Sequence, residues 1–111
     1  MKIIVDRDSV CMGDDVLSHE VEFEVPEDMT VKDLFDFLEM ERYLPSVQGN
    51  NVAWELRNRN GEHGVYFTKT REIIHPDALL KEMVEGFDGT PLFVLLHHYT
   101  PEAYYIRKEK K

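Results

Sequence analysis

The segment EFEVPEDMTVKDL, residues 22–34, contains the end of a strand, a proline and the start of a helix. It continues an alternation that begins at Leu17, in which Leu17, His19, Val21, Phe23 and Val25 alternate with Ser18 and three glutamates. Period-two alternation is typical of a β-strand with one face in the core and the other in water. Pro26 ends this strand, because proline cannot donate a hydrogen bond to a neighbouring strand. Thr30, with Asp33 three residues later, has the pattern of a helix N-cap.

The residues after Thr30 predict an amphipathic helix. Val31, Leu34, Phe35 and Leu38 follow the spacing i, i+3, i+4 and i+7, which places their side chains on one face. A helix with one apolar face must cover another apolar surface, so we expect it to lie across a sheet. The helix should end near Glu41.

Further strands are expected on both sides of this strand and helix. Residues 2–5 are apolar and β-branched, which predicts an N-terminal strand. Residues 52–57 alternate again, and residues 65–68 form a fourth strand. The sequence NRNG at positions 58–61 joins these two strands, because Asn-Gly supplies the positive φ values of a tight hairpin turn.

The last third of the chain predicts a short helix, a strand and a tail. Pro76 fits the first turn of a helix whose apolar face includes Leu80 and Met83. The run Leu92–Leu96 shows no alternation, which predicts a strand in the middle of the sheet, buried on both faces. We expect one domain over residues 1–99 and a polar, basic tail over residues 100–111.

This order of strands and helices resembles the ubiquitin-like β-grasp superfamily, and residues 22–34 are similar to its second strand and helix start. The resemblance implies an α+β fold with a mixed sheet of four to five strands (ββαββ, short helix, β) and one main helix across one face. Conjugated modifiers and sulfur carriers of this kind end in Gly-Gly, whereas this chain ends in Lys110-Lys111. Ferredoxins that share the β-grasp fold bind an iron–sulfur cluster through four cysteines, whereas Cys11 is the single cysteine in this chain. The resemblance therefore implies a role in binding other proteins.

The charge distribution disfavours nucleic acid and membrane surfaces as partners. The formal net charge is −9, and residues 107–111 hold four bases and one acid, so residues 1–106 carry −12. Nucleic-acid affinity that is independent of sequence comes from basic side chains that displace counterions, so such an acidic body repels phosphate backbones. The longest apolar run, Leu92–Leu96, is far shorter than the roughly 20 residues of a membrane span. We expect a cytoplasmic protein.

The sequence contains no pattern that predicts an enzyme or a cofactor site. Cys11 lies among acidic neighbours, which raise the pKa of a thiol and disfavour a nucleophile. His97 and His98 are adjacent on a predicted strand, so their rings should point to opposite faces and not share a metal ion. We therefore expect no catalytic residue, no metal and no cofactor. The alternative is a small-molecule or metal-responsive domain that uses His19, His97 or His98 with nearby carboxylates.

The leading hypothesis is a non-catalytic interaction module or adaptor that binds a protein partner through an acidic sheet face. If Val21, Phe23 and Val25 face the helix, the side chains of Glu20, Glu22 and Glu24 lie on the uncovered face. Trp54 is either an anchor on that face or part of the core. Tyr104 and Tyr105 in the tail either pack on the domain or contact a partner. The sequence leaves the oligomeric state open.

Overall fold

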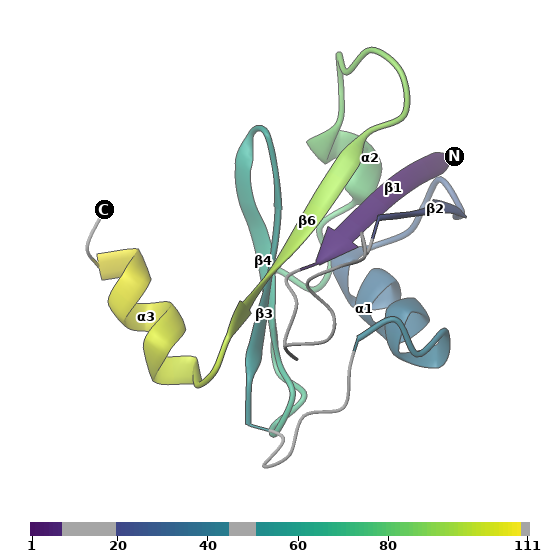
Figure 1. Cartoon of the computed structure of the whole chain (residues 1–111). Helices are drawn as coiled ribbons and strands as arrows, with labels where there is room; N and C mark the ends of the chain where they lie inside the picture. The colour runs from purple at the N-terminus through teal and green to yellow at the C-terminus, as the bar shows by residue number, and fades with distance from the viewer. Residues whose placement is uncertain (8–19, 45–50, 110–111) are drawn as a thin grey trace.

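The computed structural model describes residues 1–7, 20–44 and 51–109, and it confirms the α+β class. Within these residues the elements follow in the order β1 (Lys2–Arg7), β2 (Val21–Glu24), α1 (Val31–Met40), β3 (Ala53–Asn58), β4 (Gly61–Phe67), β5 (Ile73–Ile74), α2 (Leu80–Met83), β6 (Leu92–His98) and α3 (Pro101–Glu109) (Figure 1). The predicted positions Cys11, Leu17 and His19 lie outside the described residues.

The strands form one mixed sheet in the order β2-β1-β6-β3-β4-β5. β1 and β6 pair in parallel at its centre, and every other pairing in the described sheet is antiparallel. The central position predicted for residues 92–96 is confirmed. The expected number of strands was too small, because the described residues contain six. The additional strand, β5, spans two residues and pairs with β4 at the edge.

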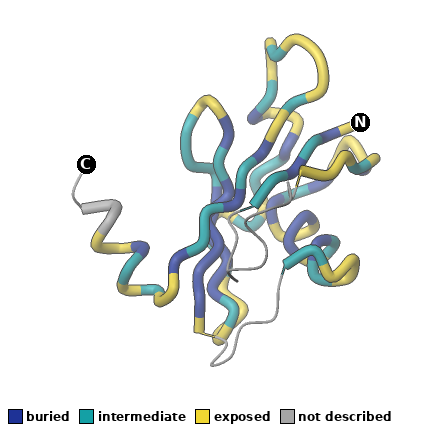
Figure 2. The backbone as a smooth tube through the Cα atoms, in the orientation of Figure 1, coloured by how far each residue is buried: buried dark blue, intermediate teal, exposed yellow. Residues whose placement is uncertain are grey.

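One face of the sheet is covered by α1, as its apolar spacing predicted. Val31, Leu34, Phe35 and Leu38 are fully buried and pack with Ile3, Val5, Leu56, Phe93 and Leu95 from the strands. The helix begins at a complete capping box, in which the Thr30 hydroxyl accepts from the Asp33 N–H at 3.1 Å and the Thr30 N–H donates to the Asp33 carboxylate at 3.2 Å. These contacts satisfy two backbone groups that the first turn leaves without helical partners. Figure 2 shows the resulting buried layer between α1 and the strands.

The β3–β4 hairpin forms at the predicted turn. Asn58 pairs with Gly61, and Gly61 adopts a φ of 117°, a conformation that side chains larger than hydrogen disfavour. Arg59 and Asn60, which form the turn between Asn58 and Gly61, keep negative φ values, so of the predicted Asn-Gly pair only Gly61 has a positive φ. A register shift between Leu56 and Arg57 adds a bulge near the turn.

Residues 101–109, predicted as part of a polar tail, form helix α3. Its N-terminus is capped by the Thr100 hydroxyl, which accepts from the Ala103 N–H at 3.1 Å. Tyr104 is 1% exposed and packs with Ala53, Val65 and Phe67 in a second, smaller core cluster. Ala53 is adjacent to Trp54 of the main core, so this cluster lies on the opposite face of the sheet. α3 therefore covers one end of the face that α1 leaves uncovered.

Two further predictions were wrong in detail. The short helix begins at Leu80, four residues after Pro76, and is a single turn. β6 is not buried on both faces. Phe93 and Leu95 are fully buried in the main core, whereas Leu92 is 41% exposed and Val94 and Leu96 are partly exposed. None of the described helices is long and apolar enough to span a bilayer.

Candidate functional site

A row of aliphatic side chains lies on the sheet face opposite α1, here called the open face. Ile4 of β1 is the register partner of Leu92 of β6, and Val94 and Leu96 follow at every second position. Their side chains point away from Val5, Phe93 and Leu95, which face the core. We call Ile4, Leu92, Val94 and Leu96 the aliphatic stripe. It is partly exposed to solvent although it runs through the centre of the sheet.

Carboxylates border this stripe along β2. Glu22 is paired with Ile4 and Glu24 with Lys2, so these side chains share the open face. Glu20, which directly precedes β2, is exposed, and the next residue, Val21, is the register partner of Val5 on β1. The structure therefore places Glu22 and Glu24 on one face, as the alternation predicted, with Glu20 next to them in the chain, and we call these three glutamates the acidic flank. The carboxylate of Glu24 lies 3.3 Å from the amino group of Met1, which neutralises part of its charge.

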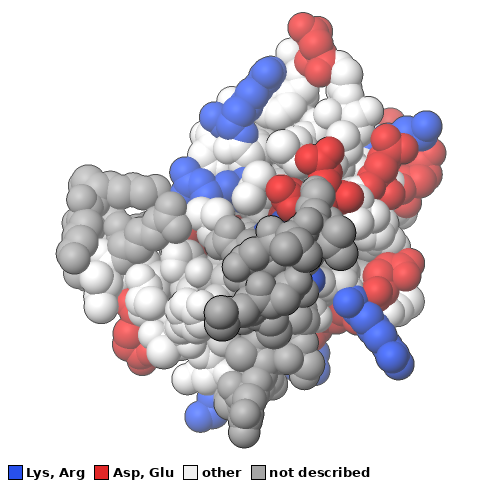
Figure 3. Space-filling view, in the orientation of Figure 1, with Lys and Arg blue, Asp and Glu red and all other residues white. Residues whose placement is uncertain are grey.

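Arginines border the stripe on its other side. Arg57 is the register partner of Val94 across β3 and β6, and Arg59 follows in the hairpin turn. The guanidinium carbon of Arg59 lies 3.8 Å from the centroid of the Phe87 ring, a cation–π contact. We call Arg57 and Arg59 the basic flank. In the upper part of Figure 3, blue atoms stand to the left of a white band and red atoms to its right, where one further blue group lies beside the red ones.

A groove of about 490 Å³ lies between the stripe and the basic flank. Leu92, Val94 and Leu96 line it from β6, Arg59 lines it from the hairpin turn and Phe87 from the loop that precedes β6. Volumes of this size accept a large side chain or a small organic molecule. The open face thus combines an apolar surface, a hollow and charges of opposite sign at its two sides.

A second group of polar side chains is buried where α3 covers the sheet. The Glu55 carboxylate is 2% exposed and accepts hydrogen bonds from Arg57 Nη1 at 2.5 Å and from His98 Nε2 at 2.9 Å. The Tyr104 hydroxyl donates to the Glu62 carboxylate at 2.6 Å, and its ring lies 5.5 Å from the His98 ring. Burial alone would raise the pKa of Glu55, but the bonds from Arg57 and His98 outweigh it and lower that pKa.

The other predicted site residues are dispersed. Trp54 is 1% exposed in the main core, so the prediction of an anchor on the open face was wrong and the core alternative was right. The side chain of Tyr104 projects from α3 onto the sheet and is buried there, so Tyr104 packs on the domain and is not an exposed contact for a partner. Tyr105 is 49% exposed, and its ring stacks on Phe67 at 5.9 Å. Its role in binding stays a prediction.

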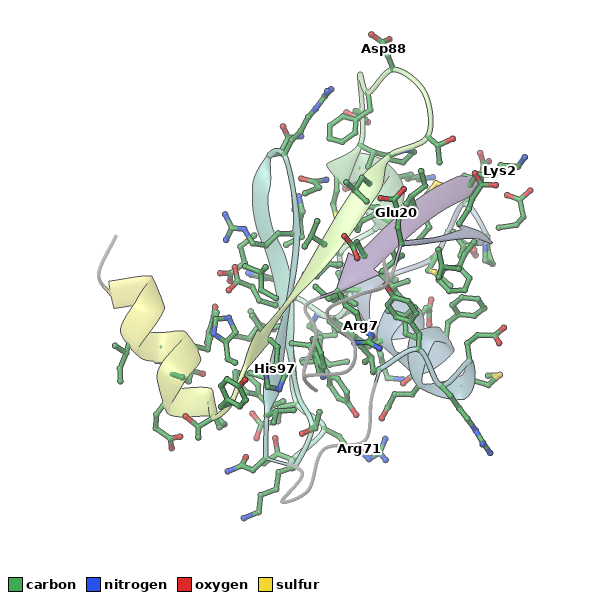
Figure 4. The ribbon with its side chains drawn as sticks, in the orientation of Figure 1. Lys2, Arg7, Glu20, Arg71, Asp88 and His97 are labelled. Atoms are coloured by element: carbon green, nitrogen blue, oxygen red, sulfur yellow. The ribbon has the colours of Figure 1, made fainter. Side chains whose placement is uncertain are left out.

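His97 and His98 point to opposite faces, as their adjacency predicted. His98 bonds to Glu55 on the α3 side, whereas the His97 ring lies 4.8 Å from Trp54 and 4.6 Å from Tyr99 (Figure 4). Within the described part of the chain, no group of three or more His, Cys, Asp or Glu side chains is placed to hold a metal ion.

Sequence reasoning missed the part of the aliphatic stripe that lies on β6, the basic flank and Glu55. The run Leu92–Leu96 concealed the stripe, because five consecutive apolar residues give no sign of which side is covered. The alternation of Ala53, Glu55 and Arg57 with Trp54 and Leu56 was the signal for the basic flank and for Glu55.

No protein-family model matches the sequence, and comparison with curated proteins and with solved structures also finds no match.

Proposed function

We propose that this chain is a non-catalytic interaction module with a ubiquitin-like β-grasp fold, and that it binds a protein partner through its open face. The sheet order supports the fold assignment. In that order β1 lies between β2 and the parallel strand β6, and the hairpin β3–β4 follows on the other side. α1 connects β2 to β3 and covers one face, as the resemblance of residues 22–34 implies.

The burial of the polar cluster around Glu55 supports a binding role over catalysis. Glu55, Arg57 and His98 form the most developed group of titratable side chains among the described residues, and they resemble an acid–base arrangement. A catalytic group must reach its substrate. Glu55 is 2% and His98 6% exposed, so both are out of reach of a substrate. Their bonds join β3 to β6 and act in stability.

The observation that carries the proposal is the exposed aliphatic stripe beside the acidic flank. Exposed apolar side chains grouped on one face and bordered by charges are typical of protein-binding surfaces. The stripe runs along the two parallel strands at the centre of the sheet, β1 and β6. The acidic flank favours a partner whose apolar side chains are bordered by Lys or Arg, because complementary charge accelerates encounter and suppresses other partners.

Affinity capture from native cell extract with a matched pair of charge variants tests this proposal. The face variant is Glu22→Lys/Glu24→Lys. The control, Glu82→Lys/Glu85→Lys, makes the same charge change at exposed positions in and after α2. We expect the wild type and the control to capture a stoichiometric partner, and we expect the face variant to lose it. Moderate salt should weaken capture of this partner by the wild type. A partner retained by the face variant, or no partner for the wild type, would overturn the proposal.

A further inference from the structure

The open face carries opposite charges on the two sides of one apolar stripe, so it is complementary to itself. Glu22 borders the stripe on the β2 side and forms no ion pair with the described residues. Arg59 borders it on the β3 side, and within the described chain its polar head contacts the Phe87 ring and no carboxylate. Each side of the face thus offers one of the charges that the other side needs.

We infer that two copies of this chain pair through their open faces, about a two-fold axis that runs along the aliphatic stripe. The inference rests on the proposed function, because it names a second copy as a partner with the required chemistry. A two-fold interface uses the same surface on both subunits, so each contact occurs twice. Rotation about the stripe places Leu92 and Val94 against the same stripe of the other copy. It also places Arg59 opposite the partner's Glu22.

The charge pattern selects this axis over the alternative one. A two-fold axis that lies in the face but crosses the stripe would place Arg59 opposite the partner's Arg59 and Glu22 opposite the partner's Glu22. Like charges at short range disfavour that arrangement. With the axis along the stripe, both symmetric Arg59–Glu22 contacts are attractive. The apolar side chains contribute the affinity, and the charges fix the orientation.

The dimensions of the face predict a weak dimer. Neighbouring strands lie about 4.8 Å apart, so the distance from β2 to β3 is roughly 14 Å, and a six-residue strand is roughly 20 Å long. A face of this size is smaller than the roughly 800 Å² that each partner buries in a stable complex. The net charge of −9 on each copy opposes association further. We therefore expect micromolar to millimolar dissociation constants.

Sedimentation equilibrium of the full chain, from about 10 µM to about 1 mM, measures this association directly. We expect Glu22→Arg and Arg59→Glu each to weaken self-association about tenfold, because each removes two attractive contacts and creates two repulsive ones. An equimolar mixture of the two variants should restore association, because both contacts of the mixed dimer are attractive again. The controls are Glu82→Arg and Lys81→Glu on α2, which make the same charge changes away from the open face.

The mixture keeps the test decisive if a variant is less stable, because a misfolded chain cannot restore association. A wild type that stays monomeric up to about 1 mM, or association that neither variant weakens, would overturn the inference. An equimolar mixture that associates no more strongly than either variant alone would also overturn the inference. If the chain is monomeric but still loses its captured partner in Glu22→Lys/Glu24→Lys, the inference fails while the proposed function stands. If the charge-swapped pair associates but no other protein is captured, binding to other proteins is overturned while the inference stands, and the open face serves self-association alone.

Discussion

The imidazole of His98 and the carboxylate of Glu55 form a buried hydrogen bond between β6 and β3, with 2.9 Å between Nε2 and Oε1. Arg57, which lies on β3 like Glu55, donates a second hydrogen bond to the same carboxylate. Burying a charged group is costly unless it is paired, so each of these groups depends on the others. The cluster ties the two strands that carry the basic flank and most of the aliphatic stripe.

We predict that Glu55→Ala lowers the free energy of unfolding by about 1–3 kcal/mol, because buried His98 would lose its hydrogen-bond partner and the partly exposed Arg57 would lose its ion pair. Urea denaturation followed by circular dichroism measures the change. The control is Glu22→Ala, an exposed position on β2, which should change the same quantity by less than about 0.5 kcal/mol. Equal effects of the two substitutions would contradict the stabilising role of the cluster.

Acid should destabilise the fold partly through Glu55. Its pKa is lowered in the folded chain, because the bonds from Arg57 and His98 outweigh the effect of burial. The unfolded chain therefore takes up the proton first as the pH falls below about 4.3, and the contribution of Glu55 is lost as the pH falls through its folded pKa. Stability measured at about pH 6 and about pH 3 should fall more steeply in the wild type than in Glu55→Gln. Parallel pH profiles would exclude this contribution.

The local elements could be predicted from the sequence, whereas the surfaces could not. The alternation and the Thr30 cap depend on neighbours a few residues apart, so the capping box and α1 were predicted correctly. Of the strand predicted up to Val25, the described residues form β2 over Val21–Glu24. α3 was missed because its apolar residues, Tyr104 to Ile106, are consecutive and lack the helical spacing. The pair Thr100-Pro101 was the available signal, as a cap followed by proline at the first helical position.

The open face depends on long-range pairing, which a single sequence does not contain. Glu22 and Arg59 border the same stripe because β1 pairs in parallel with β6 and β6 pairs with β3. Neither pairing leaves a local pattern in residues 92–96, where both faces of the strand are apolar. Trp54 shows the same limit, because alternation fixes which residues share a face but not which face α1 covers.

Removing the Tyr104 ring should expose the second core cluster. The ring packs against Ala53, Val65 and Phe67, and its hydroxyl donates to Glu62. We expect Tyr104→Ala to cost about 3–5 kcal/mol and Tyr104→Phe about 1–3 kcal/mol, because the second change removes the hydrogen bond and keeps the ring. Chemical denaturation gives both values. Tyr105→Ala, at a half-exposed neighbour on α3, is the control, and an equal loss there would contradict this packing.

Gly64 should not tolerate a side chain. A Cβ at this position of β4 would lie 2.9 Å from the carbonyl oxygen of Ile74 and 2.9 Å from Cγ1 of Val31. The backbone oxygen belongs to the β4–β5 pairing and has little freedom to move. We therefore expect Gly64→Ala to lower the thermal unfolding midpoint and to cost about 1–3 kcal/mol. Strand propensity alone predicts the opposite sign, a gain of roughly 0.5–1 kcal/mol, so a raised midpoint would show that the close approach is absent.

Alkaline pH should weaken the contact between β4 and α1 through Tyr66. Its hydroxyl donates to the Glu39 carboxylate at 2.9 Å, and burial, together with this bond, raises the pKa of Tyr66 to about 12. The unfolded chain ionises this tyrosine near pH 10, so its stabilising contribution is complete below about pH 10 and is lost as the pH rises towards the folded pKa. The expected slope for this one group is roughly 1.4 kcal/mol for each pH unit.

Unfolding free energies measured between about pH 9 and pH 11.5 should therefore fall less steeply for Tyr66→Phe than for the wild type. Tyr43 and Tyr104 also have raised pKa values, chiefly through burial, so part of the slope should remain in the variant. Up to about pH 11, Tyr66 is still protonated in the folded wild type and does not contribute tyrosinate absorbance. The ultraviolet absorbance of tyrosinate should therefore rise equally in the folded wild type and in folded Tyr66→Phe over this range. Tyr105→Phe removes a hydroxyl from a half-exposed ring and serves as the control. An unchanged slope in Tyr66→Phe would mean that Tyr66 ionises equally in the folded and unfolded chains, against the environment that Glu39 and the core create.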